Sequence, residues 1–203
     1  MPRPALAIRD ALARRAPVSD AELDQVFPEE LRERSDLQWT PVAIALRAAE
    51  LLAPSPDLRV LDVGAGVGKV CLVGAIVTGA MWWGVEQDAA LVAAANHAAW
   101  ALDIAGRTRF VHGDGSRLLW DEFDGFYFYN PFTTLMLAPH ASPFVRYATI
   151  QSTLRRIEQQ LASTRIGTRV VTYHGFGGKL PEGYTLISRE PAGGDALDLW
   201  IRA

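Results

Sequence analysis

Three acidic side chains follow short apolar segments of the chain, and a glycine-rich turn accompanies the first of them. Asp62 precedes a turn with glycines at alternate positions of residues 64–68, Glu86 ends the next apolar run, and Asp114 follows the third. Carboxylates accept hydrogen bonds from hydroxyl and amino groups, and glycine lets a ligand approach the main chain closely. Because parallel strands present their carboxyl ends at one edge of a sheet, these residues predict a small-molecule binding site there.

The spacing of the glycines restricts the ligand. The dinucleotide fingerprint G-x-G-x-x-G requires a third glycine where this chain has Lys69, and the turn instead reads G-x-G-x-G. The turn alone leaves three interpretations open, which are S-adenosylmethionine, a dinucleotide, or a purely structural glycine turn. A sulfonium cofactor without phosphate favours acids near it over an anion cradle, and Asp62 agrees with the first interpretation.

The turn and its upstream acid resemble the first motif of class I S-adenosylmethionine-dependent methyltransferases. In that family, the acid after the second strand accepts the ribose hydroxyls and the acid after the third receives the adenine amine. The resemblance therefore implies S-adenosyl-L-methionine as the cofactor. The candidate cofactor-binding residues are Asp62, Gly64, Ala65, Gly66, Gly68, Glu86, Gln87, Gly113, Asp114 and Gly115.

Trp39 and Thr40 precede a helix expected over residues 41–52. In the resembling family, the segment upstream of the glycine motif often closes over the cofactor, so both residues are candidates to line the pocket. The alternative is that Trp39 anchors the core and Thr40 caps the helix.

The predicted acceptor side follows strands four and five. Asn130, Pro131 and Phe132 come after a strand over residues 125–129, and they resemble the Asn-Pro-Pro-Tyr or Phe motif of amino-group methyltransferases, although with one proline. That resemblance implies that Asn130 orients a target nitrogen, and Asn130 is also a candidate cofactor contact. His174, in a glycine-rich loop, is the candidate general base. Strand-terminal turns and loop histidines are also common without any catalytic role.

A weaker resemblance, to the non-SET histone lysine methyltransferases, rests on residues 64–69 and 84–86 and points to a protein acceptor. We expect methyl transfer to a nitrogen of a small molecule or a protein side chain. The alternative is a non-catalytic regulatory module that binds S-adenosylmethionine or a nucleoside. A dinucleotide oxidoreductase is a third candidate, for which the sequence offers no hydride-transfer site.

Composition and charge limit the partners, metal sites and cellular location that we expect for this protein. The 203 residues carry a net charge of −3, which gives no electrostatic footprint for a nucleic acid, and none is expected as partner. A single cysteine, Cys71, permits neither an intrachain disulfide nor a multi-cysteine metal site, and no metal is expected. The chain has no apolar run of membrane length and no secretory signal, so a cytoplasmic protein is expected. The oligomeric state is left open.

The periodicity predicts an α/β fold in two parts. Residues 1–52 are expected to form an N-terminal helical cover, and the resemblance implies that residues 53–203 form a class I methyltransferase domain. Strand five is expected over residues 165–173, and a helix over residues 67–78 follows the glycine turn. The link between the last two strands, residues 184–190 and 196–202, is too short for a crossover helix, so they must pair antiparallel. The family resemblance implies a three-layer sandwich with a seven-stranded, mostly parallel sheet in the order 3-2-1-4-5-7-6.

Overall fold

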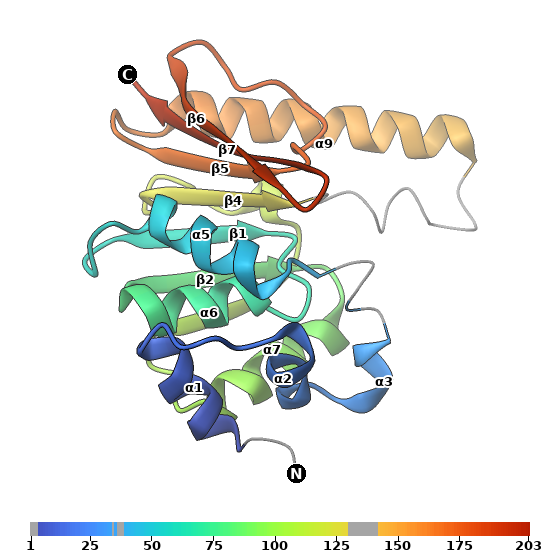
Figure 1. Ribbon diagram of the computed structural model, residues 1–203. Coiled ribbons are helices and arrows are strands. Elements are labelled where there is room, and N and C mark those ends of the chain that lie inside the picture. The colour runs from blue at the N-terminus through green and yellow to red at the C-terminus, as the bar shows by residue number, and fades with distance from the viewer. Residues whose placement is uncertain (1–3, 34, 36–38, 130–141) are drawn as a thin grey trace.

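A seven-stranded sheet organises the molecule (Figure 1). The computed structural model describes residues 4–33, 35, 39–129 and 142–203. The strand order is β3-β2-β1-β4-β5-β7-β6, with β1 to β5 parallel and β7 antiparallel to both of its neighbours. The strands are β1 (Arg59–Val63), β2 (Met81–Glu86), β3 (Thr108–His112), β4 (Gly125–Tyr129), β5 (Arg169–Tyr173), β6 (Tyr184–Ala192) and β7 (Asp195–Arg202). The predicted fold class and strand order are confirmed.

Helices cover both faces of this sheet, with α5, α6 and α7 on one and α9 on the other (Figure 1). Two short 3-10 helices are named η1 and η2. The helical segments are α1 (Ala5–Ala13), α2 (Asp20–Leu23), η1 (Asp24–Val26), α3 (Glu29–Arg32), α5 (Val42–Leu52), α6 (Lys69–Thr78), α7 (Ala89–Ala101), η2 (Gly115–Arg117) and α9 (Pro143–Ser163).

The central strands are apolar on both faces, as parallel strands between two helical layers must be. In β4, Tyr127 joins the core under α5 and α6, whereas Phe126 and Phe128 join the core under α9. Trp120 stacks on Phe126 with ring centroids 4.6 Å apart, and it fills the second core beside α9. The sheet is therefore held between two separate apolar layers.

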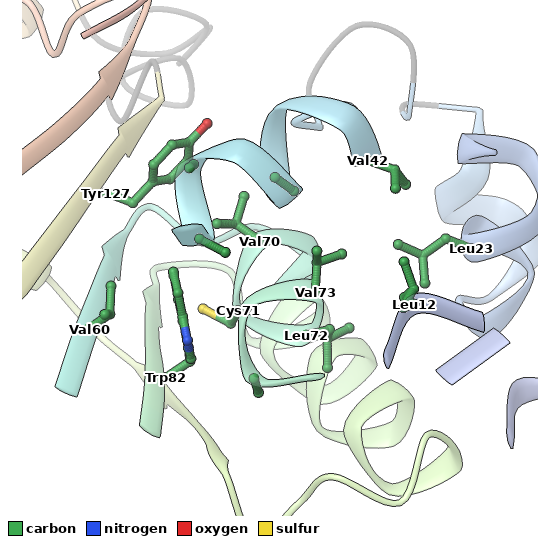
Figure 2. Close-up of a cluster of buried hydrophobic side chains, with 14 of the residues drawn as sticks. Leu12, Leu23, Val42, Val60, Val70, Cys71, Leu72, Val73, Trp82 and Tyr127 are labelled. Atoms are coloured by element: carbon green, nitrogen blue, oxygen red, sulfur yellow. The ribbon is translucent and has the colours of Figure 1, made fainter. Parts of the chain in front are cut away.

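The N-terminal helices pack into the first of these layers. Ser19 and Glu22 form a reciprocal capping box that begins α2. Leu12 and Leu23 belong to the same buried cluster as Leu72 of α6 (Figure 2). The division of the chain at residue 52 stays a prediction, although the N-terminal segment shares a core with the sheet.

At three places, element boundaries differ from the prediction next to glycines with positive φ. Helix α6 begins at Lys69, two residues late, because Gly68 is left-handed at φ 77°. Strand β5 begins at Arg169, four residues late, because Gly167 at φ 87° belongs to a turn. The terminal hairpin closes with two residues, Gly193 and Gly194, at φ 52° and 90°. Such a turn matches strand twist and lets both strands extend further than expected.

Candidate functional site

The glycine turn folds back onto β2 and leaves one side open. The main-chain N–H groups of Gly64 and Ala65 donate to the Val85 carbonyl at 2.9 and 3.1 Å. Gly66 lies at φ 55°, and a Cβ built on it would meet no atom within 4 Å. A Cβ on Gly68, in contrast, would lie 2.3 Å from the Phe110 ring. Gly66 thus faces open space where a ligand can approach, and Gly68 is required by packing.

A pocket opens at this turn, and it unites six of the predicted cofactor-binding residues. Those six are Trp39, Thr40, Asp62, Gly64, Ala65 and Gly66. The lining also includes residues that the sequence interpretation did not assign to a site, which are Val67, Lys69, Val70, Tyr127 and Tyr129.

Asp62 lies buried at the back of the pocket. Burial raises the pKa of Asp62 to about 8, an effect that the nearby Glu86 carboxylate increases and a hydrogen bond from Cys71 opposes. The Cys71 Sγ lies 3.8 Å from Asp62 Oδ2, and the cysteine is itself fully buried. The carboxyl group is therefore poised to ionise when a cation or a hydrogen-bond donor enters the pocket.

Glu86 holds the glycine turn from the end of β2. Its carboxylate accepts from the Gly66 N–H at 2.9 Å and from the N–H groups of Gln87 and Asp88 at 2.7 and 3.0 Å. A carboxylate has about four acceptor positions, so one remains for a ligand hydroxyl. The Gln87 N–H is thus engaged by Glu86, and the predicted contact of Gln87 with the cofactor stays a prediction.

The predicted residues after β3 lie outside the pocket lining, and Gly113 contacts the main chain of Glu86. The Gly113 N–H donates to the Glu86 carbonyl at 2.8 Å, and Gly115 packs so that a Cβ would lie 2.7 Å from Val85. Asp114 caps η2 by accepting from the Ser116 N–H and hydroxyl at 3.0 and 2.7 Å. Asp114 has partners within its own chain, and its predicted contact with adenine stays a prediction.

Lys69 is the lysine of the pocket, and two acids neutralise it. Its Nζ lies 2.5 Å from Asp20 Oδ1 and 2.8 Å from Asp24 Oδ1, and the side chain is 3% exposed. No other lysine or arginine belongs to the lining that the described residues form. The pocket therefore offers acceptors and acids, with no cation free for a phosphate.

Trp39 has both of the roles that the sequence left open, whereas Thr40 lines the pocket without capping the helix. Trp39 is buried and meets Phe27 edge to face at 5.0 Å, while it also lines the pocket. The Thr40 hydroxyl lies 3.1 Å from the Tyr127 hydroxyl, and the cap of α5 is Pro41 rather than Thr40. The N-terminal segment thus supplies one wall of the pocket.

The acceptor-side candidates divide into two groups. Asn130, Pro131 and Phe132 lie outside the described residues. His174 follows β5, and its ring centroid lies 5.5 Å from that of Tyr129, which lines the pocket. The predicted general base is thus adjacent to the cofactor pocket.

Comparison with known proteins supports the fold. No protein-family model and no curated protein matches the sequence. A solved RNA methyltransferase from Salinibacter ruber, in complex with S-adenosyl-L-homocysteine, superposes with a TM-score of 0.59 at 22% identity, over 80% of this chain and 92% of the other. A mutant of MtNAS in complex with S-adenosylmethionine gives 0.58 at 15% identity, over 97% and 72%. The [4+2]-cyclase SpnF gives 0.55 at 18% identity, over 73% and 58%.

The chain has the class I methyltransferase fold. The predicted resemblance to this fold is confirmed by the strand order and by these structures. The match with MtNAS covers nearly the whole chain, so it extends over the N-terminal helices as well. In the described part of this fold, no helix has the length and apolar character needed to cross a membrane. Nor do the described histidine, cysteine and acidic residues form a group of three or more that could hold a metal ion.

Proposed function

We propose that this protein binds S-adenosylmethionine and transfers its methyl group to a nitrogen of a small molecule or a protein side chain. The acceptor-rich pocket at the carboxyl end of β1 carries this proposal. Asp62 and Glu86 flank an open glycine turn, and Lys69 is neutralised by Asp20 and Asp24. A pyrophosphate would meet acids without a free cation in this lining, whereas a sulfonium and an amino group would meet favourable charge.

Different residues of the pocket suit different parts of such a cofactor. The main chain of residues 64–66 and the Asp62 carboxyl suit its methionine half, and the remaining acceptor position of Glu86 suits a ribose hydroxyl. The bound sulfonium supplies an activated methyl group, so the protein contributes chiefly by positioning and by excluding water. Trp39 and Tyr127, both buried at the pocket wall, serve that exclusion.

Calorimetry with S-adenosylhomocysteine tests the cofactor assignment. We expect a micromolar Kd, about −8 kcal/mol. Glu86→Ala should weaken binding by about 2 kcal/mol, because it removes the charge-assisted bond to a ribose hydroxyl and the bond that holds the Gly66 N–H. As a matched control, Glu122→Ala removes an exposed carboxylate paired with Arg59 at the opposite end of β1, and binding should stay unchanged. Tight binding of NAD without binding of S-adenosylhomocysteine would contradict the assignment.

A second experiment separates the enzyme from a non-catalytic binding module. The protein is incubated with S-adenosylmethionine and, in separate reactions, with 2-phenylethylamine, a lysine-containing peptide or transfer RNA. The product formed from the cofactor is then identified by its mass. Transfer RNA is included because one structural neighbour is an RNA methyltransferase. The product must be identified because this fold also occurs in a [4+2]-cyclase, so the fold alone does not establish methyl transfer. Binding without any product would favour the regulatory module.

A further inference from the structure

A histidine, a carboxylate and two tyrosines form a cluster beside the cofactor pocket. Tyr129 ends β4 and lines the pocket, Tyr173 ends β5, and His174 follows directly. The ring centroid of His174 lies 4.2 Å from that of Tyr173 and 5.5 Å from that of Tyr129. The two tyrosine rings are 5.0 Å apart. The cluster is thus continuous with the pocket through Tyr129.

The terminal hairpin fixes the histidine. His174 Nδ1 is paired with Asp195 Oδ2, and Asp195 is the first residue of β7. The hairpin turn is built closely against the same cluster, because a Cβ on Gly193 would lie 2.5 Å from the Tyr173 hydroxyl oxygen. Since a carboxylate can only accept, the neutral imidazole must donate its Nδ1–H and leave Nε2 as an acceptor.

The backbone of His174 is itself unusual. Its φ is 59°, in the left-handed region that non-glycine residues seldom occupy. Backbone strain of this kind persists where surrounding contacts hold it, and it is concentrated at functional sites. Here the turn places the imidazole against both tyrosine rings, and Asp195 holds it there.

We propose that this cluster is the methyl-acceptor site, that it takes an alkylammonium group, and that His174 removes the proton while Asp195 acts as its positioning residue. The proposal rests on the proposed methyl transfer and deepens it. Faces of tyrosine rings attract an ammonium group, and a protonated amine has no free lone pair until it loses a proton. Tyr129 lines the pocket and supplies such a ring, the buried Tyr173 packs against Tyr129 and His174, and Nε2 of His174 supplies the proton acceptor.

Every proton and electron pair is accounted for in the proposed methyl transfer to the amine. The N–H bond of the ammonium breaks, its proton goes to His174 Nε2, and its electron pair becomes the lone pair of the nitrogen. That lone pair forms the bond to the methyl carbon, while the carbon–sulfur bond breaks and its pair stays on sulfur. The resulting imidazolium is stabilised by Asp195. Both side chains are partly exposed, so the proton can then pass to water.

Imidazole nitrogen NMR of the intact protein tests the geometry without any substrate. We expect neutral His174 to be protonated at Nδ1, and Asp195→Ala to shift it to the Nε2–H form that free histidine prefers. His112 is the internal comparison, because its Nε2 lies 3.0 Å from the Gln87 carbonyl and must carry the proton there. An Nε2–H tautomer for His174 in the unaltered protein would overturn the proposal.

Kinetics with the amine or peptide that is methylated test the role. His174→Gln and Asp195→Asn should each lower kcat at least about tenfold, with little change in KM and none in the Kd of S-adenosylhomocysteine. Asp195→Glu should restore part of the loss. Asp198→Asn is the matched control, because that hairpin carboxylate pairs with Arg189 instead of histidine, and kcat should be retained.

Different results would contradict the proposed acceptor site and the proposed methyl transfer. Wild-type kcat in both His174→Gln and Asp195→Asn would overturn the acceptor site while leaving methyl transfer intact. Absence of S-adenosylhomocysteine binding in the unaltered protein would instead defeat the proposed function, whatever tautomer His174 adopts.

Discussion

Asp62 is a buried acid that its own chain satisfies only in part. Its one hydrogen bond to a side chain comes, among the described residues, from the weak thiol donor of Cys71. Burial is the largest cause of its altered pKa, which is raised to about 8 from the ordinary value of 3.8. The folded protein therefore holds a proton on Asp62 over a pH range in which the unfolded chain has lost it.

This difference predicts that stability of the ligand-free protein falls with rising pH. Between the unfolded pKa and about 8, the folded state binds more protons, so the free energy of unfolding should decrease by about 1.4 kcal/mol per pH unit. Stability is greatest below this window and is lost as pH rises through about 8. Urea unfolding at pH 6, 7 and 8 measures the slope.

Asp62→Asn should flatten that slope, since an amide does not titrate. Asp57→Asn serves as a control, because Asp57 is exposed in the linker before β1 and should leave the slope unchanged. A slope in Asp62→Asn equal to that of the unaltered protein would show that another group is responsible.

At the scale of elements, the N-terminal helices are tied to the binding turn by charge as well as by apolar packing. Lys69 is the first residue of α6, where the helix dipole disfavours a cation. Asp20 in α2 and Asp24 in η1 compensate it, and Asp20 Oδ1 also accepts from the Val42 N–H of α5 at 2.9 Å. One acidic pair thus links three helical elements to the pocket.

Removing either the lysine or the buried acid of this ion pair should lower the free energy of unfolding. Lys69→Met leaves two acids without their cation, and Asp24→Asn removes a buried partner, so each should lower the free energy of unfolding by about 3 kcal/mol. The double variant should lose less than the sum, by about 1 to 3 kcal/mol. Denaturant unfolding of all three measures this coupling.

The exposed ion pair between Arg15 and Glu50 is the control for this comparison of single and double variants. Its loss should change stability by less than about 1 kcal/mol, because solvent screens it. Strictly additive effects of Lys69→Met and Asp24→Asn would show that the two side chains do not stabilise one another.

A cofactor bound between the N-terminal segment and the sheet should stabilise the folded state of the protein. S-adenosylhomocysteine at 100 times its Kd contributes about 2.7 kcal/mol. For a chain of this size, that raises Tm by about 5 to 10 °C. Thermal melts with and without the ligand measure the shift, and Glu86→Ala should lose most of it at the same ligand concentration. A larger shift with NAD would reverse the cofactor assignment.

Much of the fold was set by local sequence pattern. The apolar runs that end at Asp62 and Glu86 became β1 and β2, because strands buried on both faces need nearly continuous apolar sequence. The edge strand β3 instead keeps Arg109 and His112 exposed. The short link before Asp195 already required an antiparallel hairpin. At the start of β5, the observed boundary differs from the predicted one because a glycine has positive φ. Glycine allows this backbone conformation but does not require it, so the sequence alone could not predict it.

The glycine turn and the acids at the strand ends were predictable from the sequence, and the strand order from its resemblance to a known family. Which side chains meet became visible only in the folded chain. Lys69 lies 49 positions from Asp20, and Asp195 reaches His174 only through the folded hairpin. Helix and strand periodicity arises from neighbours a few residues apart. A charge pair across elements depends instead on how whole helices and strands pack, which no local pattern contains.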